Sequence, residues 1–349
     1  MNPRRTQPPL AHLATLLLLF AACGKDDPVK PKPPSGPSVP SGTLAFRSSQ
    51  DGEVYTVGTD GSNLRKLTAT GGGVLNYSWS PDGAKFLFVA TGGVWTVNGD
   101  GTGSTNVAAG DYPSWSPDGT KILHTRSNPS NYSDVWVMNA NGTGAANLSQ
   151  NGTLTGSWSP AWSPDGSRIV FMTVRRTSPS DITGTLSIER MNADGSGRAI
   201  ITTGRNDLPS WSADGTQVVF LANRSSDPYE YRLLATDAAG TTEHAVYPDL
   251  VLPETLLRAP DGRIVLKSPV SPSGVAGYDM TYLAPVNGTT ASRLSTALPG
   301  AERPSWSPDG AHCVVETGSY LHVIRSDGTD VAEIPNTFQA TDPVWRPGN

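Results

Sequence analysis

One five-residue motif, Trp-Ser-Pro-Asp-Gly, recurs at near-regular intervals along this chain and constrains its fold more than any other feature. Successive tryptophan positions are 36, 47, 49, 47, 48 and 39 residues apart. A period of this length is typical of propeller blades, solenoid turns or arrays. The intact copies begin at Trp79, Trp115, Trp162 and Trp306, the copy at Trp211 has alanine in place of proline, and degenerate copies stand at 258–262 and 344–348.

The motif predicts a tight turn between two strands. Proline presets φ at the first central position, aspartate bonds the nearby backbone, and glycine accepts positive φ. A short strand such as 113–115 precedes the turn. The strand that follows, such as 168–173, is apolar at consecutive positions, so we expect neighbouring sheets to cover both of its faces.

A second motif lies about twenty to thirty residues after each tryptophan and predicts another hairpin. It is a strand that ends in a tight turn, mostly Asn/Asp-Gly, and a short strand follows it. One repeat therefore supplies four antiparallel strands, and such sheets at this period predict an all-β fold, a β-propeller. The seven copies are 54–61, 94–101, 135–142, 188–195, 233–240, 282–288 and 321–328.

The two ends of the chain are predicted to complete one blade. Residues 44–68 contain the second to fourth strands but no tryptophan-bearing first strand, whereas 343–345 is a first strand with nothing after it. Seven blades of about 44 residues each are expected, closed by the C-terminal strand. Six or eight blades are the alternatives.

These repeats resemble those of the C-terminal propeller of TolB and, more distantly, WD repeats. The resemblance covers nearly all of residues 44–349 and implies the fold. It does not assign a function, because one fold hosts many activities. TolB itself has six blades and a further N-terminal domain, so its Tol–Pal role is not carried over.

The N-terminus predicts export and lipidation. Arg4 and Arg5 precede a short apolar run at 10–20, as in a secretory signal peptide. Residues 19–23, Leu-Phe-Ala-Ala-Cys, resemble a bacterial lipobox, which implies cleavage before Cys23 and acylation of its thiol. The alternative is an ordinary signal peptide with an incidental cysteine. The expected domains are a lipoprotein signal peptide at 1–22, a lipidated tether at 23–43 and the propeller at 44–349.

Residues 24–43 contain six prolines and no apolar pattern. They predict a semi-extended tether of roughly 60 Å, at ~3.1 Å per residue, that holds the domain off a membrane. No aspartate directly follows Cys23, which favours outer-membrane sorting. The sequence 24–27, Gly-Lys-Asp-Asp, resembles the export signal of surface lipoproteins in Bacteroidetes. A solvated charge run is the alternative, so periplasmic and surface locations both remain open.

Composition limits the partners and the redox chemistry. The chain carries 37 glycines and 30 prolines, and only 16% of its residues are charged. Residues 24–349 hold 24 basic and 31 acidic side chains, a net charge of −7 that disfavours nucleic acid. With Cys23 acylated, Cys313 in an apolar strand has no partner, so no disulfide is expected. A monomer is expected.

We expect the functional site at one end of the propeller, where the connections between strands vary in length. The loops at 175–184, 150–160 and 247–256 stand out, and variable loops on a rigid scaffold are where binding sites usually lie. The residues before the inner strands are expected to ring the mouth of the channel. They either form an acidic rim that binds a partner, or cap loops and pair among themselves. These partner-binding candidates are Asp111, Tyr112, Trp158, Arg205, Asp207, Glu302, Arg303 and Asp342.

The pattern favours a non-catalytic binding scaffold for an envelope protein or surface glycan, without a cofactor or metal. His124, His312 and His322 fall in predicted strands and join no carboxylates at metal-ligand spacing. A hairpin near Gly318 could place His312 and His322 as diagonal neighbours. No Gly-x-Ser-x-Gly motif is present. The alternative is a propeller polysaccharide lyase, which needs histidines and carboxylates together at the channel mouth.

Overall fold

The structure, a computed structural model, describes a chain built of β-strands and turns. It describes residues 40–130, 132–181, 183–223, 232–246, 303–329 and 331–348 in full, and the backbone of 256–258, 264–270, 276–283, 291–293 and 302. Within these ranges there is no helix, and hence none long and apolar enough to cross a membrane. The predicted signal peptide and Cys23 lie outside the described residues.

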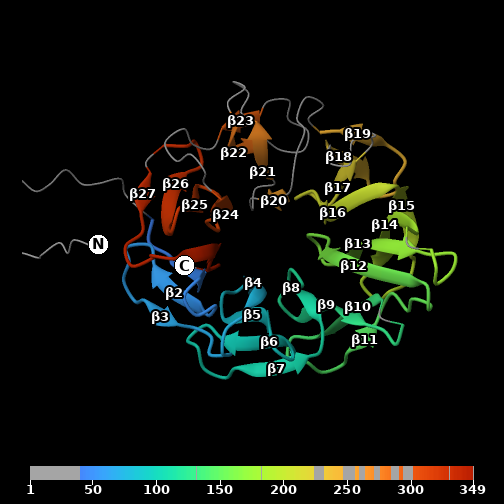
Figure 1. The fold of residues 1–349 in the computed structure, drawn as a ribbon, viewed down its shortest axis with the longest axis horizontal. Coiled ribbons are helices and arrows are strands. Elements are labelled where there is room, and N and C mark those ends of the chain that lie inside the picture. Colours follow the sequence, from blue (N-terminus) through green and yellow to red (C-terminus); the bar gives the residue numbers. More distant parts are fainter. Residues whose placement is uncertain are drawn as a thin grey trace, which may run out of the picture. The chain divides into compact units, whose positions relative to one another are not determined.

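Seven four-stranded antiparallel sheets follow one another around a ring (Figure 1), as the repeat predicts. The first strand of each sheet lies nearest the centre. From inner to outer strand, the sheets are β28, β1, β2, β3 (Ala340–Trp345, Thr43–Ser48, Val54–Gly58, Arg65–Lys66); β4 to β7 (Leu75–Trp79, Lys85–Ala90, Gly93–Asn98, Thr105–Ala108); β8 to β11 (Asp111–Trp115, Lys121–Ser127, Ser133–Asn139, Ala146–Asn147); β12 to β15 (Thr155–Trp162, Arg168–Arg175, Thr185–Asn192, Ala199–Thr203); β16 to β19 (Arg205–Trp211, Gln217–Asn223, Arg232–Asp237, Glu243–Ala245); β20 to β23 (Leu256–Arg258, Ile264–Val270, Ala276–Leu283, Ala291–Arg293); and β24 to β27 (Glu302–Trp306, His312–Thr317, Tyr320–Arg325, Ala332–Glu333).

The core is divided among the junctions between neighbouring sheets. Along β5, Phe86 and Phe88 pack toward the sheet of β1, while Leu87 between them packs with Trp115 of the next sheet. Consecutive apolar residues therefore serve two different cores, because side chains alternate across a strand. Each fully buried Leu or Phe stabilises the fold by about 1.5–3 kcal/mol. The expected covering of both strand faces is confirmed. The repeat tryptophans Trp345 and Trp211 pack between blades.

The repeated motif forms a turn that satisfies its own polar groups. The Ser116 hydroxyl donates to Asp118 Oδ1 at 2.6 Å, and the same oxygen accepts the Thr120 N–H at 3.0 Å. Gly119 closes the turn with φ of +69°. The copy with Ala213 keeps this geometry, with Ser212 donating to Asp214 at 2.6 Å. The serine–aspartate pair and the glycine therefore fix the turn, and proline is dispensable.

Neighbouring turns stack on one another. A Cβ added at Gly119 would lie 3.4 Å from Cδ of Pro81, which belongs to the turn of the preceding blade. The packing is tighter where the ring closes, since a Cβ at Gly83 would lie 2.3 Å from the Pro347 carbonyl oxygen. That position accepts only glycine.

The C-terminal strand closes the ring, as predicted. β28 pairs with β1, placing Trp345 opposite Leu44. The Trp345 N–H donates to Ser305 Oγ of the preceding sheet at 3.0 Å. Arg346 reaches the following sheet, where its Nε donates to the Gly83 carbonyl at 2.8 Å and its guanidinium lies 4.9 Å from the centre of the Trp79 ring. One strand thus ties three sheets together.

Two sequence-based expectations need correction. The loop predicted at 150–160 is shorter, because β12 begins at Thr155 and its first residues pair with the end of β13. His312 and His322 are not diagonal neighbours: His322 pairs with Val315, three residues from His312, so the two histidines point to opposite faces of the sheet. The expected loop at 247–256 falls almost wholly outside the described residues.

A buried histidine predicts acid sensitivity. His124 in β9 is 1% exposed, and neither ring nitrogen has a hydrogen-bond partner. Burial lowers the pKa of His124 from 6.5 to about 4, with Arg126 adding to the effect. The unfolded chain therefore takes up this proton first as pH falls, so stability should decrease from pH 6.5 toward pH 4. The expected loss is about 3 kcal/mol.

The change to test is His124→Leu, which keeps the volume and removes the titrating group. We expect a flatter stability profile between pH 6.5 and 4 in chemical denaturation, and higher stability at neutral pH because no buried nitrogen is left unpaired. His244→Leu, at an exposed position in β19, is the control and should leave the profile unchanged. Parallel profiles for His124→Leu and the parent protein would contradict the assignment.

Candidate functional site

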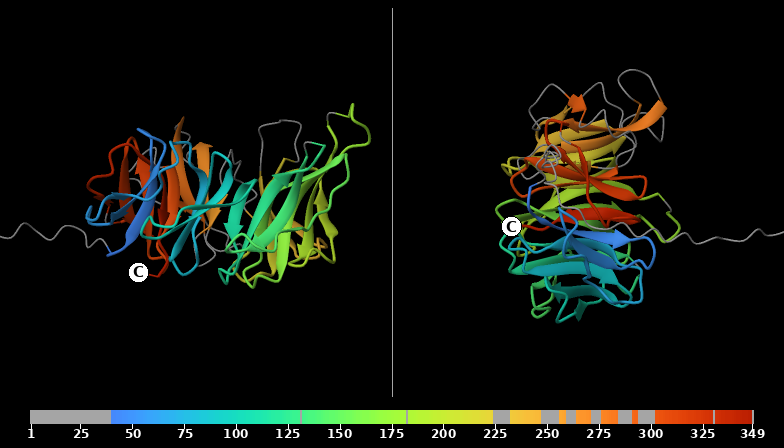
Figure 2. Two further views of the ribbon diagram at one scale, coloured as in Figure 1. Left: turned by 90° about the horizontal axis from the view of Figure 1, so that it is seen from below. Right: turned by 90° about the vertical axis from the view of Figure 1, so that its left-hand side faces the viewer.

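The two ends of the propeller differ in construction. One end carries the Ser-Pro-Asp-Gly turns and the Asx-Gly turns; we call it the turn face. The other carries the connections from second to third strand and from blade to blade; we call it the variable-loop face. Figure 2 shows the sheets from the side, with connections at both ends. Residues 176–184, between β13 and β14, form a long connection on the variable-loop face, as the sequence predicts.

Each inner strand with described side chains has a bulge just before its tryptophan motif, on the variable-loop face. In β8, Asp111 pairs with Thr125 and Ser114 with Leu123, so the residues between them are left out of regular pairing. One residue in each bulge is left-handed although it is not glycine, a conformation that costs about 1–2 kcal/mol. The six are Asn76, Tyr112, Ser159, Leu208, Arg303 and Asp342, with φ between 44° and 53°.

Proline directly follows five of these six left-handed residues, and Tyr77 follows Asn76. The residue before a proline avoids the right-handed helical region, which leaves fewer alternatives to the left-handed one. Strained backbone of this kind is found at binding and catalytic sites, and so are bulges. The repetition at one position of six inner strands therefore marks this rim as a candidate site.

Two of the predicted rim carboxylates cap their own bulges. Asp111 Oδ1 accepts the N–H of Tyr112 at 2.8 Å and the Asn76 Nδ2 of the neighbouring inner strand at 2.9 Å. Asp207 Oδ1 accepts the N–H of Leu208 at 2.8 Å. Asp111 and Asp207 therefore cap loops, which is the alternative to partner binding that their positions in the sequence allowed. The side chains that the bulges leave exposed include Tyr112, 52% exposed, and Leu208, 37% exposed.

Asp342 joins two arginines where the ring closes. Its carboxylate lies 3.1 Å from Arg47 Nη2 and also pairs with Arg303 Nη1, while its carbonyl accepts the Tyr77 hydroxyl at 2.6 Å. These groups line a pocket of about 590 Å³. Burial, and then the charge of Asp342, raises the pKa of Tyr77 well above its ordinary value. Tyr77 is therefore a neutral donor, and the cluster links β1, β4, β24 and β28.

The remaining candidates are spread around the rim. Trp158 in β12 lines a separate pocket of about 510 Å³ together with Tyr132 and Arg176. Arg205 begins β16 and is exposed. Only the backbone of Glu302 is described, in β24. The eight predicted residues thus lie at the same end of the propeller but form no single cluster, and their role in binding a partner stays a prediction.

Several residues that line these pockets were not among those predicted from the sequence. Arg47 and Tyr77 lie in strands, and nothing in their local sequence distinguishes them. Tyr132 and Arg176 lie in connections between second and third strands, and the length of the 175–184 loop was the one available signal. The Xaa-Pro pairs before the tryptophan motif were a visible sign of the left-handed residues.

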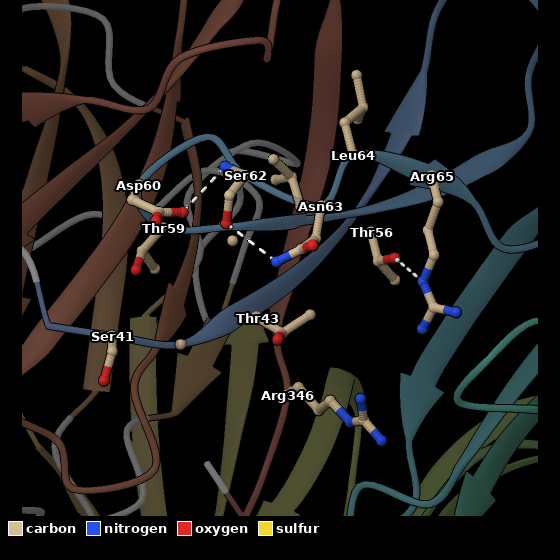
Figure 3. Close-up of a pocket in the computed structure, with 13 residues that line it drawn as sticks. Ser41, Thr43, Thr56, Thr59, Asp60, Ser62, Asn63, Leu64, Arg65 and Arg346 are labelled. Atoms are coloured by element: carbon tan, nitrogen blue, oxygen red, sulfur yellow. Dashed lines mark hydrogen bonds between the residues drawn. The ribbon is translucent and has the colours of Figure 1, made fainter.

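The turn face carries a pocket of about 720 Å³ that Arg65 and Arg346 line (Figure 3). Arg65 Nη1 donates to the Asp100 carbonyl at 2.8 Å, and its Nε donates to Thr56 Oγ1 at 3.2 Å. Arg346 binds the Gly83 carbonyl, as described above. Both guanidinium groups thereby join neighbouring blades.

One described histidine, His124, lies beside the rim, because its neighbour Thr125 in β9 pairs with Asp111. His124 is buried within its sheet junction, and His322 Nδ1 lies 2.7 Å from the Thr317 hydroxyl. Burial lowers the pKa of His322, although the nearby Glu333 opposes the shift. No group of three or more His, Cys, Asp and Glu side chains that could hold a metal ion occurs in the described part of the chain. Cys313 is a buried free thiol in β25.

Fold and repeat together define a β-propeller of the type built from Trp-Ser-Pro-Asp-Gly blades. The family model described as the TolB beta propeller domain matches residues 100–309. The chain belongs to this family. Among curated proteins, no relative matches the sequence significantly.

Solved structures of quite different proteins share the fold. TolB from Acinetobacter baumannii superimposes with a TM-score of 0.52 at 16% identity, covering 88% of this chain and 67% of that one. An oligogalacturonate lyase from Vibrio parahaemolyticus gives 0.60 at 12% identity, covering 84% and 85%. The tricorn protease gives 0.61 at 10% identity, covering 88% and 34%. At these identities the likeness extends to the fold alone.

The strain in the rim can be tested at Leu208. Its side chain is exposed, and its left-handed backbone suits asparagine far better than leucine. We expect Leu208→Asn to stabilise the protein by about 1 kcal/mol, measured by chemical denaturation. Leu75→Asn is the matched control: Leu75 is 50% exposed on the same rim and is not left-handed, so no gain is expected. A lower stability of Leu208→Asn than of the parent would contradict the strain argument.

Proposed function

We propose that this protein is a lipid-anchored, non-catalytic binding scaffold of the bacterial cell envelope. It engages a protein or glycan partner through the variable-loop face. The anchor is the acylated Cys23. The residues between it and β1, which begins at Thr43, are the tether that holds the propeller away from the outer membrane, on its periplasmic or its outer side. The proposal combines the N-terminal signals of the sequence with the construction of the two faces.

The observation that carries the proposal is the distribution of exposed hydrophobic side chains. Among the fully described residues, seven large hydrophobics are exposed. Leu64 and Ile200 lie away from the variable-loop face, in the β2–β3 turn and in outer strand β15. The other five lie on the variable-loop face: Leu75, Tyr112, Leu208, Tyr320 and Phe338. Exposed apolar side chains gathered at one end, amid polar groups, are typical of an interaction surface.

The contacts of the rim carboxylates favour binding over catalysis. A lyase needs a base and a charge-stabilising group that converge on one point. Asp111 and Asp207 instead cap backbone N–H groups, and Asp342 is held between two arginines. Propeller lyases share the fold, so polyuronide cleavage by this protein remains the outcome that would replace the scaffold with an enzyme.

The anchor predicts membrane association that depends on one thiol. Expressed in a Gram-negative host, the protein should incorporate labelled palmitate and fractionate with membranes. Cys23→Ser should lose the label and become soluble, while Cys313→Ser, which alters a buried thiol, should retain both properties. Equal labelling of the Cys23 variant and the parent would exclude the anchor.

The binding face is tested by comparing two pairs of exposed hydrophobics. We expect Tyr112→Asn with Phe338→Ser to reduce capture of an envelope component by the full chain about tenfold or more, because the contact area at the face is lost. Leu64→Ser with Ile200→Ser changes the same number of exposed side chains elsewhere and should capture as the parent does. Capture is quantified by mass spectrometry and glycan analysis of the bound fraction.

Two results would contradict this proposal. Unchanged capture by the Tyr112 and Phe338 variant would move the binding surface away from the variable-loop face. Turnover of a polyuronide by the purified chain would replace the scaffold with an enzyme. Melting temperatures of both double variants establish that the fold is intact.

A further inference from the structure

The pocket of about 510 Å³ on the variable-loop face combines aromatic rings with a cation. It lies where the sheets β8–β11 and β12–β15 meet. Tyr132 comes from the connection before β10, Trp158 from inner strand β12, and Arg176 directly follows β13. Its volume falls within the range of small-ligand pockets, about 300–1,000 Å³.

The Arg176 guanidinium has an N–H group without a hydrogen-bond partner. Its carbon lies 5.5 Å from the centre of the Tyr132 ring, and its Nη1 donates to the Tyr132 hydroxyl at 3.3 Å. Its Nε is buried and has no hydrogen-bond partner. Within the described part of the chain no carboxylate forms a salt bridge with Arg176, whereas the adjacent Arg175 pairs with Glu189. A partly desolvated cation without a counter-charge favours an anionic ligand.

The carboxylates nearest in the sequence are engaged elsewhere. Asp134 follows the pocket residue Ser133, but its Oδ1 accepts the Ser149 hydroxyl and its Oδ2 accepts Asn147 Nδ2 at 2.9 Å. Asp181, in the same loop as Arg176, accepts the N–H groups of Thr177 and Gly184. These bonds lower the pKa of the Asp181 carboxyl well below its ordinary value. Neither carboxylate neutralises the pocket by direct contact.

The rest of the lining suits a sugar ring. The C–H face of a pyranose is apolar and packs on the electron-rich face of an aromatic ring, which Tyr132 and Trp158 provide. Ser130 and Ser133 also line the pocket, and their hydroxyls make no hydrogen bond within the described residues, so they can bind sugar hydroxyls. Arg176 adds a fork of donors that matches a carboxylate in two parallel hydrogen bonds.

We propose that Tyr132, Trp158 and Arg176 form a subsite for a carboxylate-bearing sugar, a uronic acid residue of an acidic polysaccharide. The proposal rests on the proposed binding function of the variable-loop face and chooses the glycan over the protein as its partner. The aromatic rings hold the sugar ring, and Arg176 binds its carboxylate. The site binds the sugar without breaking a bond.

The experiment measures binding of uronate tetrasaccharides to the full chain by calorimetry, with carboxyl-reduced tetrasaccharides as neutral counterparts. The parent should bind the uronates more tightly than the reduced sugars by about tenfold to a hundredfold, the value of hydrogen bonds to a charged group. Arg176→Gln should abolish this preference and keep weak binding of both. Trp158→Ala should weaken both, and Arg176→Lys should not restore the parent affinity.

A matched control is available in β9, on the same sheet as the connection that carries Tyr132. Arg126 lies over the Trp136 ring at 5.3 Å, the same kind of arginine–aromatic pair, and lines none of the pockets described above. Arg126→Gln should bind uronates as the parent does. Equal loss in the Arg126 and Arg176 variants would overturn the assignment of the site.

The uronate inference and the proposed function fail in different ways. If no uronate binds while the face variant of Tyr112 and Phe338 still loses its partner, the sugar subsite is wrong and the binding face stands. If uronates bind and the Arg176 and Trp158 variants match the parent, the sugar is bound elsewhere and the subsite is again wrong.

Discussion

The architecture depends on strands that are apolar on both faces. In β5 and β13, consecutive residues are fully buried, and alternate ones belong to different cores. No sheet of this kind is stable alone, since water would cover both of its apolar faces. A linear stack would still expose the first and last sheets, as repeat arrays without caps do. A closed ring removes both ends, and this makes the pairing of β28 with β1 the step on which the other junctions depend.

Closure also leaves two ends of the molecule that differ in construction. On the turn face each serine–aspartate pair satisfies its own backbone, and each glycine packs on a neighbouring turn, so few groups are left for a ligand. On the variable-loop face the inner strands leave regular pairing through a bulge. There the backbone is strained at Tyr112 and Leu208, and their side chains are exposed. The same strained conformation recurs at one position of several inner strands, although the fold itself does not require it. A binding surface on this face would explain that recurrence.

Much of the fold was predictable because it is encoded locally. Ser116, Asp118 and Gly119 fix a turn through neighbours within five residues, and a periodic repeat multiplies that information. The start of β12 was missed because Gly156 and Ser157 carry no strand signal; their pairing with Val174 and Thr173 of β13 decides it.

The candidate site was predictable only in part. Polar residues before the inner strands could be found, but not their partners, since Asp342 binds Arg47 nearly the whole chain away. Tyr132 and Arg176 are single residues in two different connections. They meet only because the sheets β8–β11 and β12–β15 are neighbours. Local sequence patterns contain no information of that kind.

The repeat also explains how a nearly symmetric ring can be specific. Four of the inner strands present different pairs of residues at the start of the bulge: Leu75 and Asn76, Asp111 and Tyr112, Trp158 and Ser159, and Asp207 and Leu208. The tryptophan motif that follows is kept, because packing and turn geometry require it. The two residues at the bulge differ from blade to blade, and in two blades an aspartate among them caps the bulge. The ring therefore offers a different chemical group in each direction, at positions outside the motif that defines the family.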